Sequence, residues 1–487
     1  MSTGGLWMLL TLGVLVVATG LPVWALLTGV ASAFAVAGVA TAAFDAAILQ
    51  ALAPRVVNLL EHDLLQAMPL YVLIGVLLQR LPLADALYSS AARLFGRTGA
   101  GPSLAALAVG ALVAPMNGSV ASSSSLLSRL VAPRLRGLAP ARAVVLVSAA
   151  ATIGVVVPPS LVLILLGDAM LRAHTEASNT PGFSLGGQSV VSTQDVLHAA
   201  LVPAAGVLLL WAVLSWRQGR QPGASAATVP VAAGRVGLAA VAVLAILGLL
   251  AGVFTGRLFA VEAAAAGGCA LVVATLASRC LDRPQWRSVL LETLALSGAL
   301  FALLVGATTF SLVFRLFGTD RWLADQVLQS PLPPHVTSVL VLLLVALCAW
   351  VLDAFEMIFV IIPIVAPLLI VQLHDAQQVA VLLLLVLQLS FLMPPMGYAI
   401  LMTQARSGLP QVALRPLLAA LAPFLGAIVL VAATVFAAPA VVHWLDPQAP
   451  AAGAPGTPGA APSEEEIVRR MKEMATEPPA QDGPQEK

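Results

Sequence analysis

The chain has 487 residues, of which 60% are hydrophobic and only 10% are charged, and its mean hydropathy is +0.97. A soluble globular domain could not bury so much apolar surface, so the composition predicts a protein that crosses a membrane several times. The net charge of +1, with no basic patch among aromatic residues, gives no support for nucleic-acid binding and excludes that class.

Long apolar segments predict about ten membrane-spanning helices. In chain order they cover residues 5–20, 23–43, 64–79, 143–167, 196–216, 236–254, 258–277, 289–314, 376–405 and 416–442. Two further stretches, at 103–128 and 337–373, each contain a polar cluster and predict helical hairpins that enter and leave the membrane on one side. The expected fold is therefore an all-α polytopic membrane protein.

The distribution of arginine predicts the orientation, because short cytoplasmic loops retain positive charge. Four arginine clusters are expected on the inner side, within residues 80–97, 129–142, 217–235 and 279–287. Segments with few cations are expected on the outer side, together with the N-terminus, and they cover residues 45–63, 169–195 and 255–257. Arg315 and Arg321 fall on the expected outer side and depart from this pattern.

Two Pro-Pro breaks indicate a duplicated unit. Pro158-Pro159 and Pro394-Pro395 each interrupt an apolar stretch, and position 394 is 236 residues beyond 158. The same offset leads from Asn117 to Asp353. About five crossings separate the copies, and an odd number inverts the second copy, so we expect inverted repeats with broken helices.

This duplication predicts how the chain is divided. We expect N-terminal scaffold helices, a first repeat, a linker, connecting helices, a second repeat and a disordered, charged tail. Their ranges are 1–63, 64–216 with the hairpin at 103–128, 217–234, 235–288, 289–445 with the hairpin at 337–373, and 446–487.

A polar cluster in the first hairpin predicts a binding site. Asn117, Gly118 and Ser119 form a turn inside an apolar segment, and Ser122 follows in a run of serines. Exposed carbonyl and hydroxyl oxygens at such an unwound tip are suitable ligands for Na⁺, and the next helix begins with an N-terminus that favours an anion. The alternative is a serine-rich surface that lets two helices pack closely.

Asp353 and Glu356 lie one helical turn apart in the second hairpin. Carboxylates inside a membrane are candidates for function, so Asp353 is expected to bind a cation. Glu356 could orient Asp353, take up a proton or pair with an arginine. The alternative is a hairpin tip that reaches water at one surface.

The Pro-Pro breaks leave backbone carbonyls without helical partners, and these could complete the shell of a cation or hold the hairpin tips. The full set of Na⁺ candidates is Asn117, Gly118, Ser119, Thr152, Gly154, Asp353 and Ser390. The substrate candidates are Ser122, Pro158, Pro159, Glu356, Pro394, Pro395 and Gly397. Common motifs of metalloproteases, serine hydrolases and ATPases are missing from the sequence, so no enzyme is expected.

Four motifs in this order resemble the large membrane subunit of TRAP transporters, the tripartite ATP-independent periplasmic family. They are Asn117 to Ser122, Ala149 to Ser160, Leu352 to Glu356 and Phe391 to Gly397, and the resemblance extends from residue 1 to about 440. It implies a Na⁺-driven symporter of the elevator type in a bacterial inner membrane. It also implies two protein partners, a periplasmic substrate-binding protein and a small four-span membrane subunit, and an organic acid as substrate.

One departure concerns the first hairpin, where many relatives have Gly-Ser-Ser and this chain has Asn117, Gly118 and Ser119. No small subunit is fused to the sequence, so a separate partner chain is expected. The rival interpretation closest to this one is a stand-alone ion-coupled carboxylate carrier without a binding protein. A membrane-embedded enzyme using Asp353 and Glu356, or a structural scaffold, would not explain the duplication.

Overall fold

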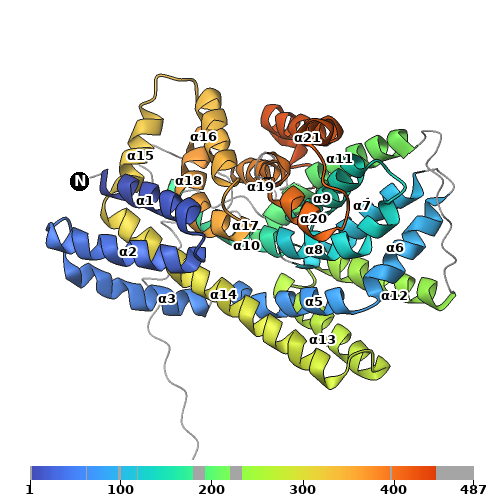
Figure 1. Cartoon of the computed structure of the whole chain (residues 1–487). Coiled ribbons are helices and arrows are strands. Elements are labelled where there is room, and N and C mark those ends of the chain that lie inside the picture. Colours follow the sequence, from blue (N-terminus) through green and yellow to red (C-terminus); the bar gives the residue numbers. More distant parts are fainter. Residues whose placement is uncertain are drawn as a thin grey trace, which may run out of the picture. The chain divides into compact units, whose positions relative to one another are not determined.

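The computed structural model of the protein describes residues 3–61, 63–96, 100–117, 119–158, 160–178, 192–219, 233–394 and 397–445. These residues belong to one compact unit that covers residues 1–445, and every regular element among them is helical (Figure 1). The expected all-α fold is confirmed. The expected tail, 446–487, and most of the expected linker, 220–232, lie outside the described residues.

The N-terminal region forms helices that precede the first hairpin. The break between the first two coincides with Gly20, whose φ of +62° suits glycine, and with Pro22 at the start of the next helix. The helices are α1 (Thr3–Thr19), α2 (Val23–Ala40), η1 (Ala46–Ala51), α3 (Leu52–Leu60), α4 (Asp63–Gln66), α5 (Met68–Arg80) and α6 (Leu83–Leu94). The helices α3 and α6 were not predicted from the sequence, because both are short and amphipathic.

Two helices and a short 3₁₀ helix between them lie at the position of the first expected hairpin, and we name this unit hairpin 1. It consists of α7 (Gly101–Val113), η3 (Pro115–Asn117) and α8 (Val120–Leu130). After η4 (Ala132–Leu135), the chain continues as α9 (Pro140–Val156), α10 (Leu161–Ser178) and α11 (Thr193–Gly219). The span expected at 143–167 is therefore two helices, separated at the first Pro-Pro break.

The second half of the chain begins with α12 (Ala233–Phe254), α13 (Ala260–Ser278), α14 (Arg283–Leu316) and α15 (Thr319–Leu328). Hairpin 2 follows and consists of α16 (Pro334–Cys348), the short α17 (Ala354–Glu356), a π-helical turn η5 (Met357–Ile361) and α18 (Ile362–Leu373). The last elements are α19 (Ala376–Leu392), α20 (Tyr398–Arg406), α21 (Leu414–Ala437) and η6 (Pro439–Val441). The span expected at 376–405 is thus also divided, at the second Pro-Pro break.

Helix boundaries repeat at the spacing seen in the sequence. The helix α19 begins at 376 and ends at 392, and each position is 236 residues beyond the corresponding end of α9. The same spacing separates the C-terminal ends of α5 and α14 (80 and 316) and the starts of α6 and α15 (83 and 319). Two copies of one helical unit therefore exist in the structure as well as in the motifs.

The number of membrane-length helices is smaller than the expected ten. Over the described residues, eight helices are long and apolar enough to cross a membrane, with Pro140–Ser178 taken as one, or nine if the bent pair α5 and α6 is counted. The pair bends by 66° at Leu81 and Pro82. Helices α1 and α19, both expected to span, have 17 residues each and fall just short. Three expected spans, α1, α5 and α19, are too short, whereas the second arm of hairpin 2, Ala354–Leu373, is long enough, and this accounts for the difference.

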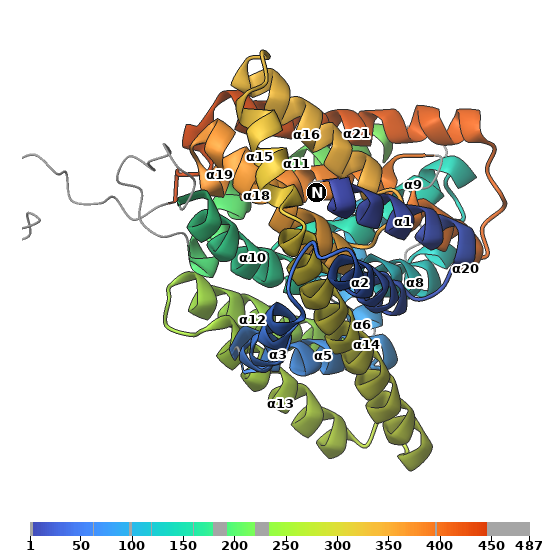
Figure 2. The same cartoon turned by 90° about the vertical axis from the view of Figure 1, so that its left-hand side faces the viewer.

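The two copies place their broken helices at the centre of the bundle. In an 18-residue apolar window within α9 and α10, 94% of residues are buried, and α19 is buried except at Val386 and Leu389. In the apolar segment Val236–Val253 of α12, only 17% of residues are buried. Apolar side chains on such outer helices are suited to contact lipid, whereas α9 and α19 contact each other inside. Figure 2 shows α12 and α13 toward the lower edge of the view, away from α9 and α19.

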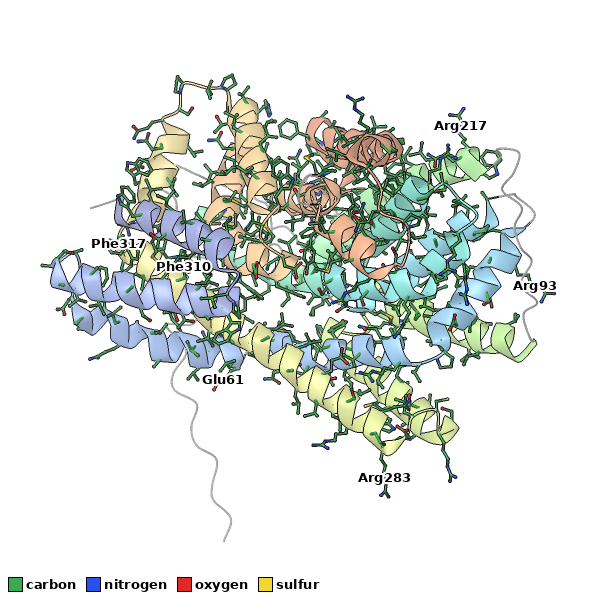
Figure 3. All side chains as sticks on the ribbon, viewed as in Figure 1. Glu61, Arg93, Arg217, Arg283, Phe310 and Phe317 are labelled. Carbon is green, nitrogen blue, oxygen red and sulfur yellow. The ribbon has the colours of Figure 1, made fainter. Side chains whose placement is uncertain are left out.

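Helix α14 runs beside α2 and connects the N-terminal helices with the rest of the bundle. Near its C-terminal end, Phe317 makes edge-on contacts with Phe34 and Phe44, at centroid distances of 6.4 and 5.4 Å. Figure 3 shows Phe310 and Phe317 on the left of the view, and Arg93, Arg217 and Arg283 toward the right. Three arginines that the charge pattern assigns to the inner side thus lie toward the same end of the bundle.

Candidate functional site

The tip of hairpin 1 packs directly against the end of α9. A Cβ atom on Gly154 would lie 2.5 Å from the carbonyl carbon of Ala114, so only glycine allows this approach. The hydroxyl of Ser123 donates a hydrogen bond to the carbonyl of Ala114 at 3.3 Å. The first Pro-Pro break and the first hairpin tip therefore form one packed unit.

The polar residues predicted to form a site at this tip differ in their place in the local secondary structure. Ser119 is the N-cap of α8, and its Oγ accepts the N–H of Ala121 at 3.2 Å. Ser122 is half-buried on α8, whereas Asn117 ends η3, and Gly118 lies outside the described residues. Two serines that sequence reasoning left unassigned, Ser124 and Ser128, have buried hydroxyls without a hydrogen-bond partner among the described residues.

Some polar groups at the first helix break already form hydrogen bonds with neighbouring residues. The carbonyl of Gly154 accepts the buried hydroxyl of Ser160 at 2.6 Å. Thr152 is fully buried and donates to Ala149 in its own helix at 2.9 Å. Pro158 is buried, and Pro159 lies outside the described residues. The break therefore contributes oxygen atoms that are already fixed in place.

Asp353 and Glu356 cap the second arm of hairpin 2. The N–H of Asp353 donates to Glu356 Oε2 at 3.0 Å, so the glutamate fixes the backbone of the aspartate. Asp353 Oδ1 is buried and has no hydrogen-bond partner in the described part of the chain. A buried carboxylate oxygen without a partner is costly, which favours a ligand that completes it.

One residue near the second break lies close to these carboxylates, and two others lie in the helix before the break. Tyr398 begins α20 and interacts electrostatically with both Asp353 and Glu356. Ser390 is buried in α19 and donates to the carbonyl of Val386 at 2.8 Å, while the amide oxygen Oε1 of Gln388 is buried without a partner among the described atoms.

The backbone at the second break turns at glycine. Gly397 has φ +24°, and its N–H donates to the carbonyl of Met393 at 3.0 Å. Pro394 is half-buried, and Pro395 lies outside the described residues.

Helix α10 brings the two hairpins together, because it contacts both η3 of hairpin 1 and η5 of hairpin 2. The copies also meet through α20, where Arg406 Nη1 donates to Ser125 Oγ on α8 at 2.8 Å. In the same region, Ser148 on α9 donates to the carbonyl of Ala399 at 3.3 Å. Sequence reasoning pointed to Gln388 as an amide beside the second break but missed Tyr398 and Arg406. Arg406 is a lone charge after an apolar segment and could have been found by that signal.

The polar groups at the two hairpin tips and helix breaks are carboxylate, amide, hydroxyl and carbonyl oxygens. Among the described residues, no group of three or more histidine, cysteine, aspartate or glutamate side chains could hold a metal ion. Oxygen-rich sites with one carboxylate suit hard cations rather than transition metals.

Comparisons with known proteins agree with the fold. Residues 9–441 match the family model described as "Tripartite ATP-independent periplasmic transporter, DctM component". A relative, the C4-dicarboxylate TRAP transporter large permease protein DctM of Pseudomonas aeruginosa, is 24% identical over 368 residues, which are 74% of this chain and 82% of the relative.

A solved structure, the YdaH transporter of Alcanivorax borkumensis, is similar in fold. Its TM-score is 0.56 at 17% sequence identity, and the match covers 83% of this chain and 91% of the other. The family match extends over nearly all of the described helices, including both hairpins and both helix breaks. The chain is therefore a multi-pass membrane protein that belongs to the tripartite ATP-independent periplasmic transporter family, as its DctM or large permease component.

Proposed function

We propose that the chain is the large membrane subunit of a Na⁺-coupled secondary transporter that imports an organic acid. The observation that carries this proposal is the buried, unpartnered Oδ1 of Asp353 at the bend of hairpin 2. A cation bound there supplies the missing electrostatic partner, and the downhill movement of that cation supplies the free energy for uptake.

Specific groups would hold the ion. Asp353 supplies a carboxylate, Glu356 positions it through the Asp353 N–H, and Gln388 supplies an amide oxygen from α19. On the side of hairpin 1, Ser119, Thr152 and the carbonyls near Gly154 supply neutral oxygens. Neutral and singly charged oxygens favour a monovalent hard cation such as Na⁺.

The substrate is proposed to be a carboxylate or 2-oxo acid. The P. aeruginosa relative is named for C4-dicarboxylate transport, and in this chain the helix α8 begins at the serine-rich tip of hairpin 1. Backbone N–H groups at such an N-terminus attract anions. We place the substrate between the two hairpins, beside Ser122 and the helix breaks.

The remaining components follow from the family and are part of the proposal. A periplasmic binding protein delivers the acid, a small four-span subunit accompanies the large one, and the complex lies in the bacterial inner membrane. Movement is proposed to be of the elevator type, in which α9, α10, α19 and both hairpins move together against the outer helices. The high burial of this inner group supports the division.

Reconstitution tests the proposal. Proteoliposomes with both membrane subunits and the loaded binding protein are expected to accumulate labelled succinate, or another organic acid that the binding protein retains, only with an inward Na⁺ gradient. Uptake with a K⁺ gradient alone, or without Na⁺, would contradict Na⁺ coupling. Uptake at the full rate without the binding protein would favour a stand-alone carrier.

A further inference from the structure

A cavity of about 590 Å³ lies outside the site formed by the hairpin tips. Its wall comes from four segments that are far apart in the sequence: α3, the second half of α10, the last turns of α14, and hairpin 2 at η5 and α18. This volume is within the range of pockets that hold small metabolites. The cavity has no role in the function proposed above.

The charged groups of the cavity leave an excess of positive charge. Its wall contains three arginines and two acids, Arg55, Arg172, Arg315, Asp168 and Glu176. Arg172 pairs with Asp168 at 2.8 Å within α10, and Arg315 on α14 forms an ion pair with Glu176. Arg55 is exposed, and no ion pair or hydrogen bond joins it to another described residue. One cation is therefore left to attract an anion.

Several observations place this cavity on the outer side of the membrane. Arg55 and Glu176 lie in the segments 45–63 and 169–195, which the charge pattern assigns to the outside. The 34 residues of α14 span roughly 50 Å at 1.5 Å per residue, more than the hydrocarbon core of about 30 Å. Because α14 begins beside the inner arginine cluster, its other end, with Arg315, reaches the outer side. The Arg315–Glu176 pair also explains how an arginine is accommodated there.

The opposite wall of the cavity leads toward the ion site. Ile358, Phe359 and Pro363 line it, and Ile358 is two residues beyond Glu356 in the same arm of hairpin 2. Thr308 and Ser311 add hydroxyl groups on α14. The cavity therefore has a charged outer part and an apolar inner part that ends at the hairpin.

We propose that this cavity is an entry vestibule that attracts and briefly holds the carboxylate of the imported anion before it reaches the hairpin tips. The inference rests on the proposed import of an organic acid. Arg55 is the free charge that draws the anion in, and the paired Arg172 and Arg315 offer further N–H donors. Asp168 and Glu176 lower the net positive charge of the cavity, so the anion binds weakly enough to dissociate toward the hairpin tips.

Charge-selective labelling tests the vestibule without any need for transport. In a background with Cys269, Cys280 and Cys348 replaced by serine, Ser311→Cys places a thiol in the cavity wall, and Thr255→Cys places one in an exposed outer turn as control. Right-side-out vesicles are treated with an anionic sulfonatoethyl or a cationic trimethylammonioethyl methanethiosulfonate. The sulfonate represents the carboxylate of the substrate.

We expect the ratio of anionic to cationic labelling rates at Ser311→Cys to exceed that at Thr255→Cys roughly three- to tenfold at low salt. Arg55→Glu should lower the ratio at Ser311→Cys to the value at Thr255→Cys in the unchanged background. Arg257→Glu, in the outer turn away from the cavity, should alter the ratio at the nearby Thr255→Cys but leave the ratio at Ser311→Cys itself unchanged. Thr308→Cys provides a second reporter if Ser311→Cys lowers the yield of folded protein. Equal ratios at the two sites, no effect of Arg55→Glu, or no labelling from outside would overturn the vestibule.

This experiment separates the two proposals. Labelling selectivity reports only the field in the cavity, so it can fail while Na⁺-driven uptake persists, and uptake can fail while the field is present. If both hold, Arg55→Glu should raise the half-saturating concentration of the loaded binding protein or free acid severalfold, without lowering the rate at saturation.

Discussion

The backbone N–H of Asp353 and the carboxylate of Glu356 are joined by a hydrogen bond of 3.0 Å, while the Oδ1 of Asp353 has no partner among the described residues. The two acids thus have unequal positions. The carboxylate of Glu356 fixes the backbone at the bend of hairpin 2. Asp353 has one buried carboxylate oxygen, Oδ1, that could bind a ligand. The first two predictions depend on this inequality.

Asp353→Asn is expected to abolish Na⁺-dependent uptake while leaving the protein folded. The amide keeps the shape of the side chain but removes the charge that balances the cation, and losing one charged ligand weakens binding roughly tenfold or more. Uptake against Na⁺ concentration in proteoliposomes measures the effect. The control is Asp325→Asn, because Asp325 is exposed on α15. Unchanged Na⁺ dependence in Asp353→Asn would exclude Asp353 as a ligand.

Glu356→Gln and Glu356→Ala are expected to differ. Glutamine can still accept the N–H of Asp353 through its carbonyl oxygen, whereas alanine leaves that N–H without its partner. We therefore expect near-normal Na⁺ affinity in Glu356→Gln and a several-fold higher half-saturating Na⁺ concentration in Glu356→Ala. Equal loss in both variants would show that the charge of Glu356, rather than its hydrogen bond, is required.

Gly154→Ala is expected to destabilise the protein by about 1–3 kcal/mol and to lower uptake, because the new methyl group would overlap the Ala114 carbonyl at the tip of hairpin 1. Gly248→Ala is the matched control. That glycine is inside α12 with no atom within 4 Å of an added Cβ, so alanine should raise helix stability slightly. Thermal unfolding in detergent compares the two, and equal midpoints would contradict the close packing at Gly154.

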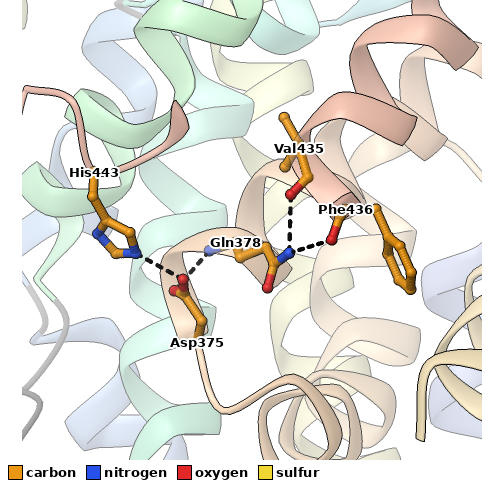
Figure 4. A network of polar contacts seen from close by, with 5 residues as sticks. All are labelled: Asp375, Gln378, Val435, Phe436 and His443. Atoms are coloured by element: carbon orange, nitrogen blue, oxygen red, sulfur yellow. Dashed lines mark hydrogen bonds and ion pairs between the residues drawn. The ribbon is translucent and has the colours of Figure 1, made fainter. Parts of the chain in front are cut away.

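A polar network at the start of α19 gives another prediction (Figure 4). Gln378 Nε2 donates to the carbonyls of Val435 and Phe436 at 2.9 and 3.1 Å, which lie in the last turn of α21. Asp375 caps α19 by accepting the Gln378 N–H at 3.0 Å and contacts His443 at 2.7 Å. The network thus holds the end of α21 against the start of α19.

Gln378→Leu is expected to cost about 1–3 kcal/mol, because it leaves two helix-terminal carbonyls without that donor. Its neighbour Gln377 provides the control, since the Oε1 of Gln377 is buried without a hydrogen bond among the described atoms. Gln377→Leu should therefore be neutral or slightly stabilising. The difference in unfolding temperature between the two leucine variants measures the contribution of the network.

Arg134→Ala is expected to loosen the loop after hairpin 1. Arg134 pairs with Asp85 at 2.5 Å, and its guanidinium lies 4.7 Å from the centre of the Tyr88 ring, so it ties this loop to α6. Both charged side chains are partly exposed, which limits the expected loss to about 1 kcal/mol or less. Arg136→Ala, at an exposed position in the same loop, is the control. The rate of proteolytic cleavage of the loop measures the effect. Equal cleavage in the two variants would contradict a specific role for the contacts of Arg134 with Asp85 and Tyr88.

Hairpins, helix breaks and duplication could be predicted from the sequence because each has a local cause. A polar cluster inside an apolar stretch and a Pro-Pro pair disrupt a helix wherever they occur, and the offset of 236 needs only counting. Helix α6, which follows the bend after α5, and the short helix α15 could not be predicted in this way. Their amphipathic sequences are too short for a periodic signal, and their ends depend on neighbouring helices.

The ligand roles expected of the site residues stay predictions, and the structure gives their positions. Asp353 lies at a helix start, Ser119 is an N-cap, and Gly154 makes a close approach. Tyr398 was missed because a tyrosine after a helix break acquires a role only through tertiary contacts. Sequence patterns show where polar groups are, whereas burial decides which of them lack a partner.

The hydrogen bond between Arg406 and Ser125 joins residues 281 positions apart, across the two copies. During synthesis at about 5–20 residues per second, Ser125 enters the membrane roughly 15–60 s before Arg406 has been made. During this interval, hairpin 1 lies in the bilayer without α20, the helix that contacts α8 in the complete structure. The serine-rich arm of α8 can pack on neighbouring helices during that interval, so the early half of the chain is protected while its partner is translated.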